Sequence, residues 1–257
     1  MHSIALFAYD KATSNWSKKM DFCRTIFHVV QQGDTFYRLA QRYHTTVPDI
    51  ITRNPGINPY NLQVGSRLRI CVGPGAEGNQ RPEEMDLSKD MRQAWSKHNM
   101  WDAMFMISLF NALENTDAVR NRLMQTPEDI AAVFEKFYSS PIVNQLRQLL
   151  TEHVRLAGEF TAAMNNNNME QEEMLENQLN QNADQIARML ASTNNKYDYE
   201  ELRRMLRMHL DIMKNSMNAE LSGEHAEAVR LIDENEEHLM ELADILTQGL
   251  LEQFYMR

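Results

Sequence analysis

The chain has 257 residues, which suffices for one or two domains with a sizeable core, and its formal net charge is −10. Residues 20–75 hold six Arg and three Asp and carry +3, residues 1–19 carry +2, and the remainder therefore carries −15. The split indicates a mildly basic module and an acidic one, and the acidic module argues against nucleic acid as a partner. No run reaches the roughly 20 apolar residues that span a membrane.

We expect residues 1–26 to be an unstructured extension. The apolar stretch 4–9 is too short for the core of a secretory signal, and basic residues follow it rather than precede it. The sequence therefore predicts no signal peptide, synthesis in the cytoplasm, and Met20 as an alternative start. Cys23 and Cys71 could form a disulfide across two neighbouring strands, but without a secretion signal the prediction favours free thiols.

Residues 27–72 predict a compact βααβ unit. A short β-branched strand around residues 28–30 is followed by Gly33, which breaks it, and by Asp34 or Thr35, which can cap a helix. A second predicted helix begins near Thr46, and residues 54–56 end it. The alternating stretch 67–70 then forms the returning strand.

The same residues resemble the LysM domain, a small βααβ carbohydrate-binding module. The matching segments, which lie in family order and spacing, are His28-Val29-Val30, Gly33-Asp34-Thr35, Leu39-Ala40 with Tyr43, Ile50 with Asn54-Pro55, and Leu62 to Ile70. One departure is Phe36-Tyr37, where the family commonly has a pair such as Leu-Trp.

The resemblance implies a shallow groove that binds the N-acetylglucosamine backbone of peptidoglycan or chitin. Two loops would line this groove, the one after the first strand and the one after the second helix. Their backbone amides and short polar side chains would grip N-acetyl groups over an apolar floor of Phe36 and Ile57. The implied binding residues are Gly33, Asp34, Thr35, Phe36, Asn54, Pro55, Gly56, Ile57 and Asn58. The alternative is a LysM fold that binds protein or nothing.

Residues 73–84 are rich in Gly, Pro and polar side chains and predict a linker, and residues 85–257 predict an all-α domain. Apolar residues at three- and four-residue spacing indicate long helices joined by short loops, and hence an up-and-down bundle. The expected helices span about 87–113, 127–138, 141–165, 170–192, 198–221 and 225–253. The predicted fold class is thus α+β multidomain, a small βααβ domain followed by an all-α bundle.

Four polar residues fall on the apolar stripes of four different helices, each near the middle of its helix: His98, His153, Asn182 and His209. In an antiparallel bundle the midpoints share a level, so these side chains are predicted to form one layer of the core. The last helix could add Asp233 or His238. Three imidazoles with one open coordination position would suit a transition metal such as zinc or iron.

The layer has a second interpretation, a hydrogen-bonded network that only fixes helix register. Ferritin-like di-iron chemistry is disfavoured, because no carboxylate lies three residues before any of these histidines. The chain also lacks a Gly-rich phosphate loop, a Gly-x-Ser-x-Gly motif and a His-Glu-x-x-His motif. No catalytic residues can be assigned, and the sequence favours a protein that is not an enzyme.

The helical part also resembles a family of uncharacterised helical proteins from spore-forming Gram-positive bacteria. The similar segments are Trp95-x-x-His98-x-x-Trp101, residues 149–153, 182–187 and 205–210, and Ala243-Asp244 with Gln253-Phe254. The resemblance implies a protein deposited on the spore or cell wall. Two hypotheses follow: a wall or spore-envelope protein whose bundle binds a partner, self-associates or is structural, or a wall-tethered metalloprotein.

Overall fold

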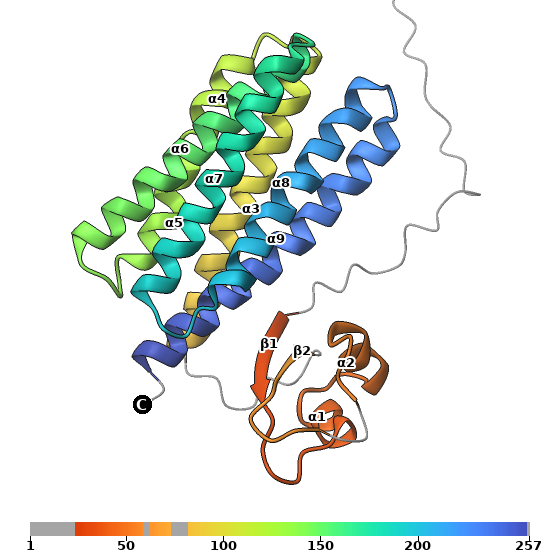
Figure 1. The fold of residues 1–257 in the computed structure, drawn as a ribbon, viewed down its shortest axis with the longest axis vertical. Helices are drawn as coiled ribbons and strands as arrows, with labels where there is room; N and C mark the ends of the chain where they lie inside the picture. Colours follow the sequence, from red (N-terminus) through yellow and green to blue (C-terminus); the bar gives the residue numbers. More distant parts are fainter. Residues whose placement is uncertain (1–23, 59–61, 73–81, 256–257) are drawn as a thin grey trace, which may run out of the picture.

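A computed structural model describes residues 24–58, 62–72 and 82–255. A small βααβ unit lies at one end of a long helical bundle (Figure 1), so the predicted fold class is confirmed. None of the helices in these ranges is both long and apolar enough to cross a membrane. Residues 1–23, which cover most of the expected N-terminal extension, and residues 73–81 of the expected linker lie outside this description.

The βααβ unit contains β1 (Arg24–Val29), α1 (Phe36–Arg42), α2 (Val47–Arg53) and β2 (Arg67–Val72). The strands pair antiparallel, from Arg24 opposite Val72 to Val29 opposite Arg67. Thr35 and Thr46 cap the two helices, each accepting a backbone N–H from the first turn. The local capping chemistry therefore sets both helix starts at the expected places.

The first strand begins at Arg24, earlier than the expected boundary at residue 27. Thr25 pairs with Cys71 across the ladder, and its backbone N–H donates to Asp244 Oδ2 of the bundle at 2.8 Å. Cys71 is disulfide-bonded, so the expectation of a free thiol at this position was wrong. Cys23 lies outside the described residues.

Five long helices of the bundle occur where the sequence places them, and two short ones accompany them. They are α3 (Pro82–Phe110), α4 (Thr116–Leu123), α5 (Thr126–Phe134), α6 (Ser140–Asn165), α7 (Met169–Thr193), α8 (Tyr199–Leu221) and α9 (His225–Phe254). The sequence analysis missed α4, a mostly polar helix that buries only Val119 and Leu123. It also placed the start of α3 too late, at residue 87, although proline suits the first turn of a helix.

The long helices are neighbours in chain order around the bundle (Figure 1). Helix α7 lies between α6 and α8, α9 packs on α8 and returns against α3, and the short α5 lies between α3 and α6. Apolar side chains fill the interior along this ring, among them the fully buried Met91, Phe134, Leu146, Ile186 and Leu202. The order of contacts is that of an up-and-down bundle with extra segments, as predicted.

The two faces of the small sheet have different partners. Leu68 and Ile70 point into the core of the βααβ unit, whereas Phe27 packs against the bundle core. This follows from strand geometry, because successive side chains point to opposite faces. The sheet is therefore sandwiched between its own helices and the bundle, with β1 against α9.

Ion pairs join the two parts at this contact. Arg69 Nη2 lies 2.9 Å from Glu201 Oε1, and Arg53 Nη1 lies 3.7 Å from Glu241 Oε1. Within the bundle, Arg92 Nη1 lies 2.8 Å from both oxygens of Asp244, the carboxylate that also accepts the Thr25 N–H. Some of the positive charge of the first module thus neutralises the acidic bundle rather than remaining free for a partner.

The glycine on α9 provides a test of packing. A Cβ at Gly249 would overlap the ring of Tyr197, whose hydroxyl donates to the Leu246 carbonyl at 2.6 Å. We expect Gly249→Ala to lower the free energy of unfolding by about 1–3 kcal/mol, because overpacking forces side chains to shift. Urea unfolding of the full chain measures this.

The matched control is Gly158→Ala on α6, where the added Cβ would meet Phe105 at an ordinary 3.8 Å. This substitution should be neutral or stabilise by about 0.5–1 kcal/mol, because alanine favours helix over glycine. Equal effects of the two substitutions would contradict the packing described at Gly249.

Candidate functional site

The residues implied to bind glycan fall into two groups in the βααβ unit. Five are exposed: Gly33, Thr35, Pro55, Gly56 and Asn58. Ile57 is half-buried against the core of the unit. These residues present backbone and short side chains to solvent at two loops, which is the surface that a shallow glycan groove requires.

Asp34 has a mainly internal role. Its carboxylate accepts the Gln31 backbone N–H at 2.8 Å and lies 2.6 Å from Nε2 of His28, whose Nδ1 lies 2.9 Å from the Tyr43 hydroxyl. Burial by itself raises the pKa of Asp34, but the Gln31 hydrogen bond and the pairing with His28 hold this pKa below its usual value. The carboxylate therefore shapes the first loop through bonds within the unit.

Asn54 and Phe36 are also turned inward. The Asn54 amide donates to the carbonyls of Ile50 (2.6 Å) and Arg69 (2.7 Å), and its oxygen accepts the Arg69 N–H at 2.7 Å. It thereby joins the end of α2 to β2. Phe36 is only 3% exposed and belongs to the core of the unit, so it is not the exposed apolar floor that the resemblance implied.

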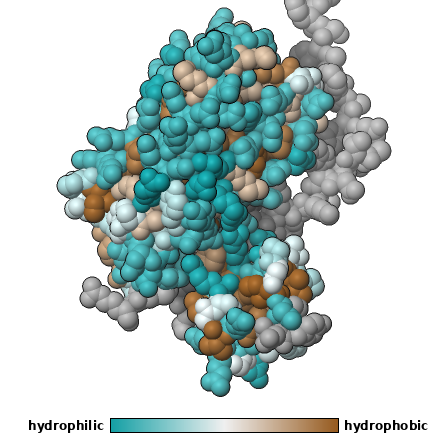
Figure 2. Space-filling view, viewed as in Figure 1, coloured by the Kyte–Doolittle hydropathy of each residue, from teal (hydrophilic) through white to brown (hydrophobic). Residues whose placement is uncertain are grey.

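An exposed aromatic residue stands beside the first loop. Tyr37, on the first turn of α1, is 65% exposed, and its hydroxyl accepts a hydrogen bond from Gln41 at 3.1 Å. The sequence analysis noted it only as a departure from the common pair. Exposed Ile51 and Val64 add apolar surface, and Figure 2 shows hydrophobic patches over this unit.

The second candidate site is a histidine layer inside the bundle. His98 on α3, His153 on α6 and His209 on α8 are at most 4% exposed. Their ring centroids lie 5.5–6.2 Å apart, and one nitrogen of each lies within 4.8 Å of the others. The structure thus brings together the three imidazoles that the sequence placed at one level.

Each imidazole is held by a neighbour from a further helix. Nδ1 of His98 lies 3.1 Å from Thr126 Oγ1, and Nδ1 of His153 lies 3.1 Å from Asn182 Oδ1. Nδ1 of His209 lies 2.9 Å from Asn235 Oδ1. Asn182, predicted as a member of the layer, therefore acts as an acceptor behind His153.

The neighbours fix which nitrogen carries the proton. The Asn182 amide donates to the Leu149 carbonyl at 3.0 Å, so its oxygen faces His153 and must accept. Thr126 donates its hydroxyl proton to the Leu123 carbonyl at 2.8 Å, so it also accepts from His98. Nδ1 is thus protonated in both rings, and Nε2 carries the lone pair.

The third imidazole ends a longer chain of hydrogen bonds. Asn235 donates to Asn99 Oδ1 at 2.6 Å, and Asn99 donates to Glu236 Oε2 at 3.0 Å. The chain orients both amides, so His209 donates through Nδ1 and its Nε2 is also a lone pair. That Nε2 is buried without a hydrogen-bond partner. Three lone pairs therefore converge in a protein interior.

Burial also sets the charge of the layer. It lowers the pKa of His98 to about 3, together with the nearby His153, and the pKa of His153 to about 4. Burial and the other two rings hold the pKa of His209 well below its usual value. All three imidazoles are neutral at physiological pH, which is the form that binds metal ions.

Two candidates from α9 lie outside the cluster. His238 donates through Nε2 to the Met205 carbonyl at 2.7 Å, and Asp233 is exposed. The α9 residue in the layer is Asn235, which the sequence analysis missed together with Thr126 and Asn99. A signal for Asn235 exists, because it lies four residues after the buried Leu231 on the same stripe.

A small pocket adjoins the layer. His98, His153 and Thr126 line it together with apolar side chains, namely Trp95, Pro127, Ile130, Leu150, Val154, Ile186 and Leu206. The Trp95 ring lies 6.0 Å from His98, edge to face, and its indole N–H is buried without a partner. A mostly apolar pocket therefore borders the layer, and Trp95 in its lining carries one unpaired hydrogen-bond donor.

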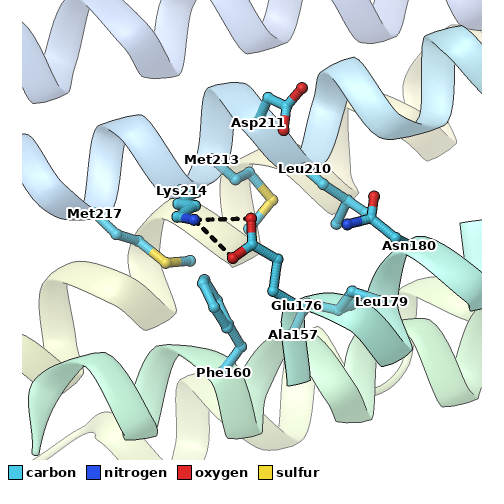
Figure 3. Close-up of a pocket in the computed structure, with 10 residues that line it drawn as sticks. All are labelled: Ala157, Phe160, Glu176, Leu179, Asn180, Leu210, Asp211, Met213, Lys214 and Met217. Atoms are coloured by element: carbon cyan, nitrogen blue, oxygen red, sulfur yellow. Dashed lines mark hydrogen bonds and ion pairs between the residues drawn. The ribbon is translucent and has the colours of Figure 1, made fainter. Parts of the chain in front are cut away.

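Another pocket, between α6, α7 and α8, contains an ion pair. Lys214 Nζ lies 2.7 Å from both Glu176 oxygens, and this ion pair lies among Phe160, Met213 and Met217 (Figure 3). Asp211 is the other charged residue of the pocket lining, and it is exposed on α8.

One buried carboxyl lies a turn along α3 from the layer. Asp102 is 4% exposed, and its Oδ2 has no hydrogen-bond partner. It lines a hollow between α3, α8 and α9 with Ser216 and Asn235. Burial raises the pKa of Asp102 to about 7.

Comparison with known proteins identifies the small unit. Residues 28–70 match the LysM domain family. No curated protein and no solved structure shows significant similarity to the chain. The match covers the βααβ unit and both of its loops, and it leaves the bundle to be interpreted from its own geometry.

The raised pKa of Asp102 predicts that the free energy of unfolding depends on pH. Its pKa rises from 3.8 when unfolded to about 7 when folded, so the unfolded chain loses the proton first and stability falls as pH rises between these values. Asp102→Asn should therefore stabilise the protein at about pH 8 by on the order of 2–4 kcal/mol and much less near pH 4. Urea unfolding at both pH values measures the difference.

The control is Asp211→Asn, at an exposed position on α8. Its effect on the free energy of unfolding should be small, because the side chain is exposed to solvent. A difference between Asp102→Asn and wild type that does not change with pH would contradict a buried, protonated Asp102.

Proposed function

We propose that the chain, which carries a LysM domain at residues 28–70, is a peptidoglycan-binding protein of the cell wall or spore envelope. A LysM domain supports binding to peptidoglycan and other N-acetylglucosamine polymers in general. In this proposal the domain anchors the helical bundle to the polymer, and the bundle binds a partner or has a structural role.

The observation that carries this proposal is the orientation of the LysM domain on the bundle. The sheet face with Thr25 and Phe27 packs against α9, whereas residues 33, 35, 55, 56 and 58 stay exposed. Docking therefore uses the face that the glycan does not need. The ion pairs of Arg53 and Arg69 with the bundle hold the domain there.

The chemistry of the exposed loops fits a neutral, N-acetylated sugar. Gly33 and Gly56 have φ values of +89° and +91°, so the backbone turns sharply and presents its amides without a Cβ in the way. Tyr37 offers an exposed ring for the apolar face of a sugar. One shallow groove orders few ligand atoms, so binding to a short oligosaccharide is weak.

A sedimentation assay with purified peptidoglycan tests the anchor. The double substitution Pro55→Glu and Asn58→Glu places two carboxylates on the second loop, where they must lose water without a partner when glycan binds. We expect at least about tenfold weaker binding, which corresponds to about 1.4 kcal/mol.

The matched control is Pro48→Glu with Thr52→Glu, which adds the same charge at exposed positions on α2. This variant should sediment with peptidoglycan as wild type does. If wild type stays in solution, or if both variants bind equally, the glycan-binding proposal is wrong.

A second candidate function is that of a wall-tethered metalloprotein. One observation favours it: three neutral imidazoles place one nitrogen each within 4.8 Å of the others in a buried layer. His98, His153 and His209 would hold a transition metal such as zinc or iron, since imidazole suits both. Thr126, Asn182 and Asn235 would orient the ligands, as acceptors behind metal-bound histidines do.

Elemental analysis of the purified full chain, equilibrated with Zn²⁺ or Fe²⁺ and then dialysed, tests this function. We expect one metal ion per chain, and affinity reduced more than about 100-fold by His153→Ala. His238→Ala is the control, because that buried imidazole lies outside the cluster. Wild-type protein that retains no metal rules out the metalloprotein, whatever the variants do.

A further inference from the structure

Four features of the histidine layer remain unexplained by a purely structural role. Three are the Nε2 lone pairs of His98, His153 and His209, since each Nδ1 is a donor and one nitrogen of each ring lies within 4.8 Å of the others; His209 Nε2 is buried without a partner. The fourth is the indole N–H of Trp95, a buried donor without a partner. Unpaired buried polar groups are uncommon, and each indicates strain or a missing ligand.

The lone pairs need a hydrogen-bond donor, a proton or a cation as a partner. A register-fixing network would give each Nε2 a donor, as Asn235 gives His209 an acceptor, but His209 Nε2 has no donor. Protonation of a ring would provide one, yet burial disfavours that charge. A cation about 2.0–2.1 Å from each nitrogen sets them about 3.3 Å apart in a tetrahedral site. The three nitrogens lie within 4.8 Å of one another, so cation binding would draw them together by up to about 1.5 Å.

The three histidines come from three helices and supply three ligands. Asn182, Asn235 and Thr126 are occupied as acceptors behind the rings, and the other α9 candidates, His238 and Asp233, face elsewhere. No carboxylate or thiolate joins the three histidines in the cluster that the described residues form. Zinc and iron sites with three protein ligands keep a position for an exogenous ligand.

The pocket beside the layer shows where that position lies. His98 and His153 line this pocket, whereas His209 does not. Leu150, Ile130 and Leu206 surround the remaining space. The polar residues of the lining are the two histidines, Thr126 and Trp95, whose indole N–H is buried without a partner. A donor in an apolar pocket next to a cation selects a small ligand that can accept a hydrogen bond.

We propose that the fourth coordination position opens into this pocket and takes a small anion or oxygen-donor ligand that accepts a hydrogen bond from Trp95 Nε1. This inference rests on the metal-binding function proposed above. It makes the layer an open metal site with a ligand-binding pocket, in contrast to a closed structural site. Trp95 is then a positioning residue for the exogenous ligand and does not bind the metal.

The test uses Co²⁺ as a spectroscopic probe and azide as the small anion, with the full chain. Titration with Co²⁺ should give the visible absorption of a four-coordinate ion at one equivalent per chain. Azide should then shift this spectrum in a saturable way, because it replaces the solvent ligand at the open position.

Trp95→Phe separates the pocket from the metal. It removes the indole donor but keeps an aromatic ring, so Co²⁺ should bind as in wild type and the Kd for azide should rise about tenfold, the effect of one lost hydrogen bond to an anion. The matched control is Trp101→Phe on the same helix, which does not line the pocket. Its azide affinity should be unchanged.

The outcomes distinguish the two proposals. If wild type binds no Co²⁺, the metal-binding function fails and this inference fails with it. If Co²⁺ binds but azide leaves the spectrum unchanged, the site is closed and the inference alone is overturned. If azide binds equally to wild type and Trp95→Phe, the open position does not face the indole, and the assignment of Trp95 is overturned.

Discussion

Imidazoles buried in a helical bundle must recover from protein groups the hydrogen bonds that water would give. Here each of the three rings recovers one bond from a helix other than its own, through Thr126 on α5, Asn182 on α7 and Asn235 on α9. Because a hydrogen bond tolerates only a narrow range of distances, these contacts constrain the shift and rotation of neighbouring helices. The apolar core above and below this layer then packs in one register.

The hydrogen bonds that orient the helices also determine where the possible ligand atoms lie. Each Nδ1 donates to a neighbouring helix, which leaves each Nε2 free of that bond. The same arrangement therefore orients the helices and brings three ligand atoms together. The chain from His209 through Asn235 and Asn99 to Glu236 carries this orientation to the bundle surface. Similar acceptors behind metal-bound histidines fix the ring and raise its basicity.

The contact between the LysM domain and the bundle determines how the two sites relate. Strand alternation leaves Phe27 on the outer face of the sheet, and this face packs on α9 while Arg69 reaches Glu201. The domain is therefore docked on the bundle through apolar packing and ion pairs as well as through a chain connection. In the proposed function, glycan binding would orient the bundle with respect to the wall.

The sequence by itself determined much of this protein, because the relevant signals are local. Capping residues and apolar periodicity located α1, α2 and the five long helices, and a motif of 43 residues identified the LysM domain. Stripe positions also placed His98, His153 and His209 at one level. Only the tertiary structure decided that Asn235, and not His238 or Asp233, completes the layer. Successive residues of a helix are rotated by about 100° about its axis, so nearby positions on α9 face different surroundings. The inward orientation of Asp34 and Asn54 and the docking of the sheet on α9 likewise depend on partners distant in sequence, which no local pattern records.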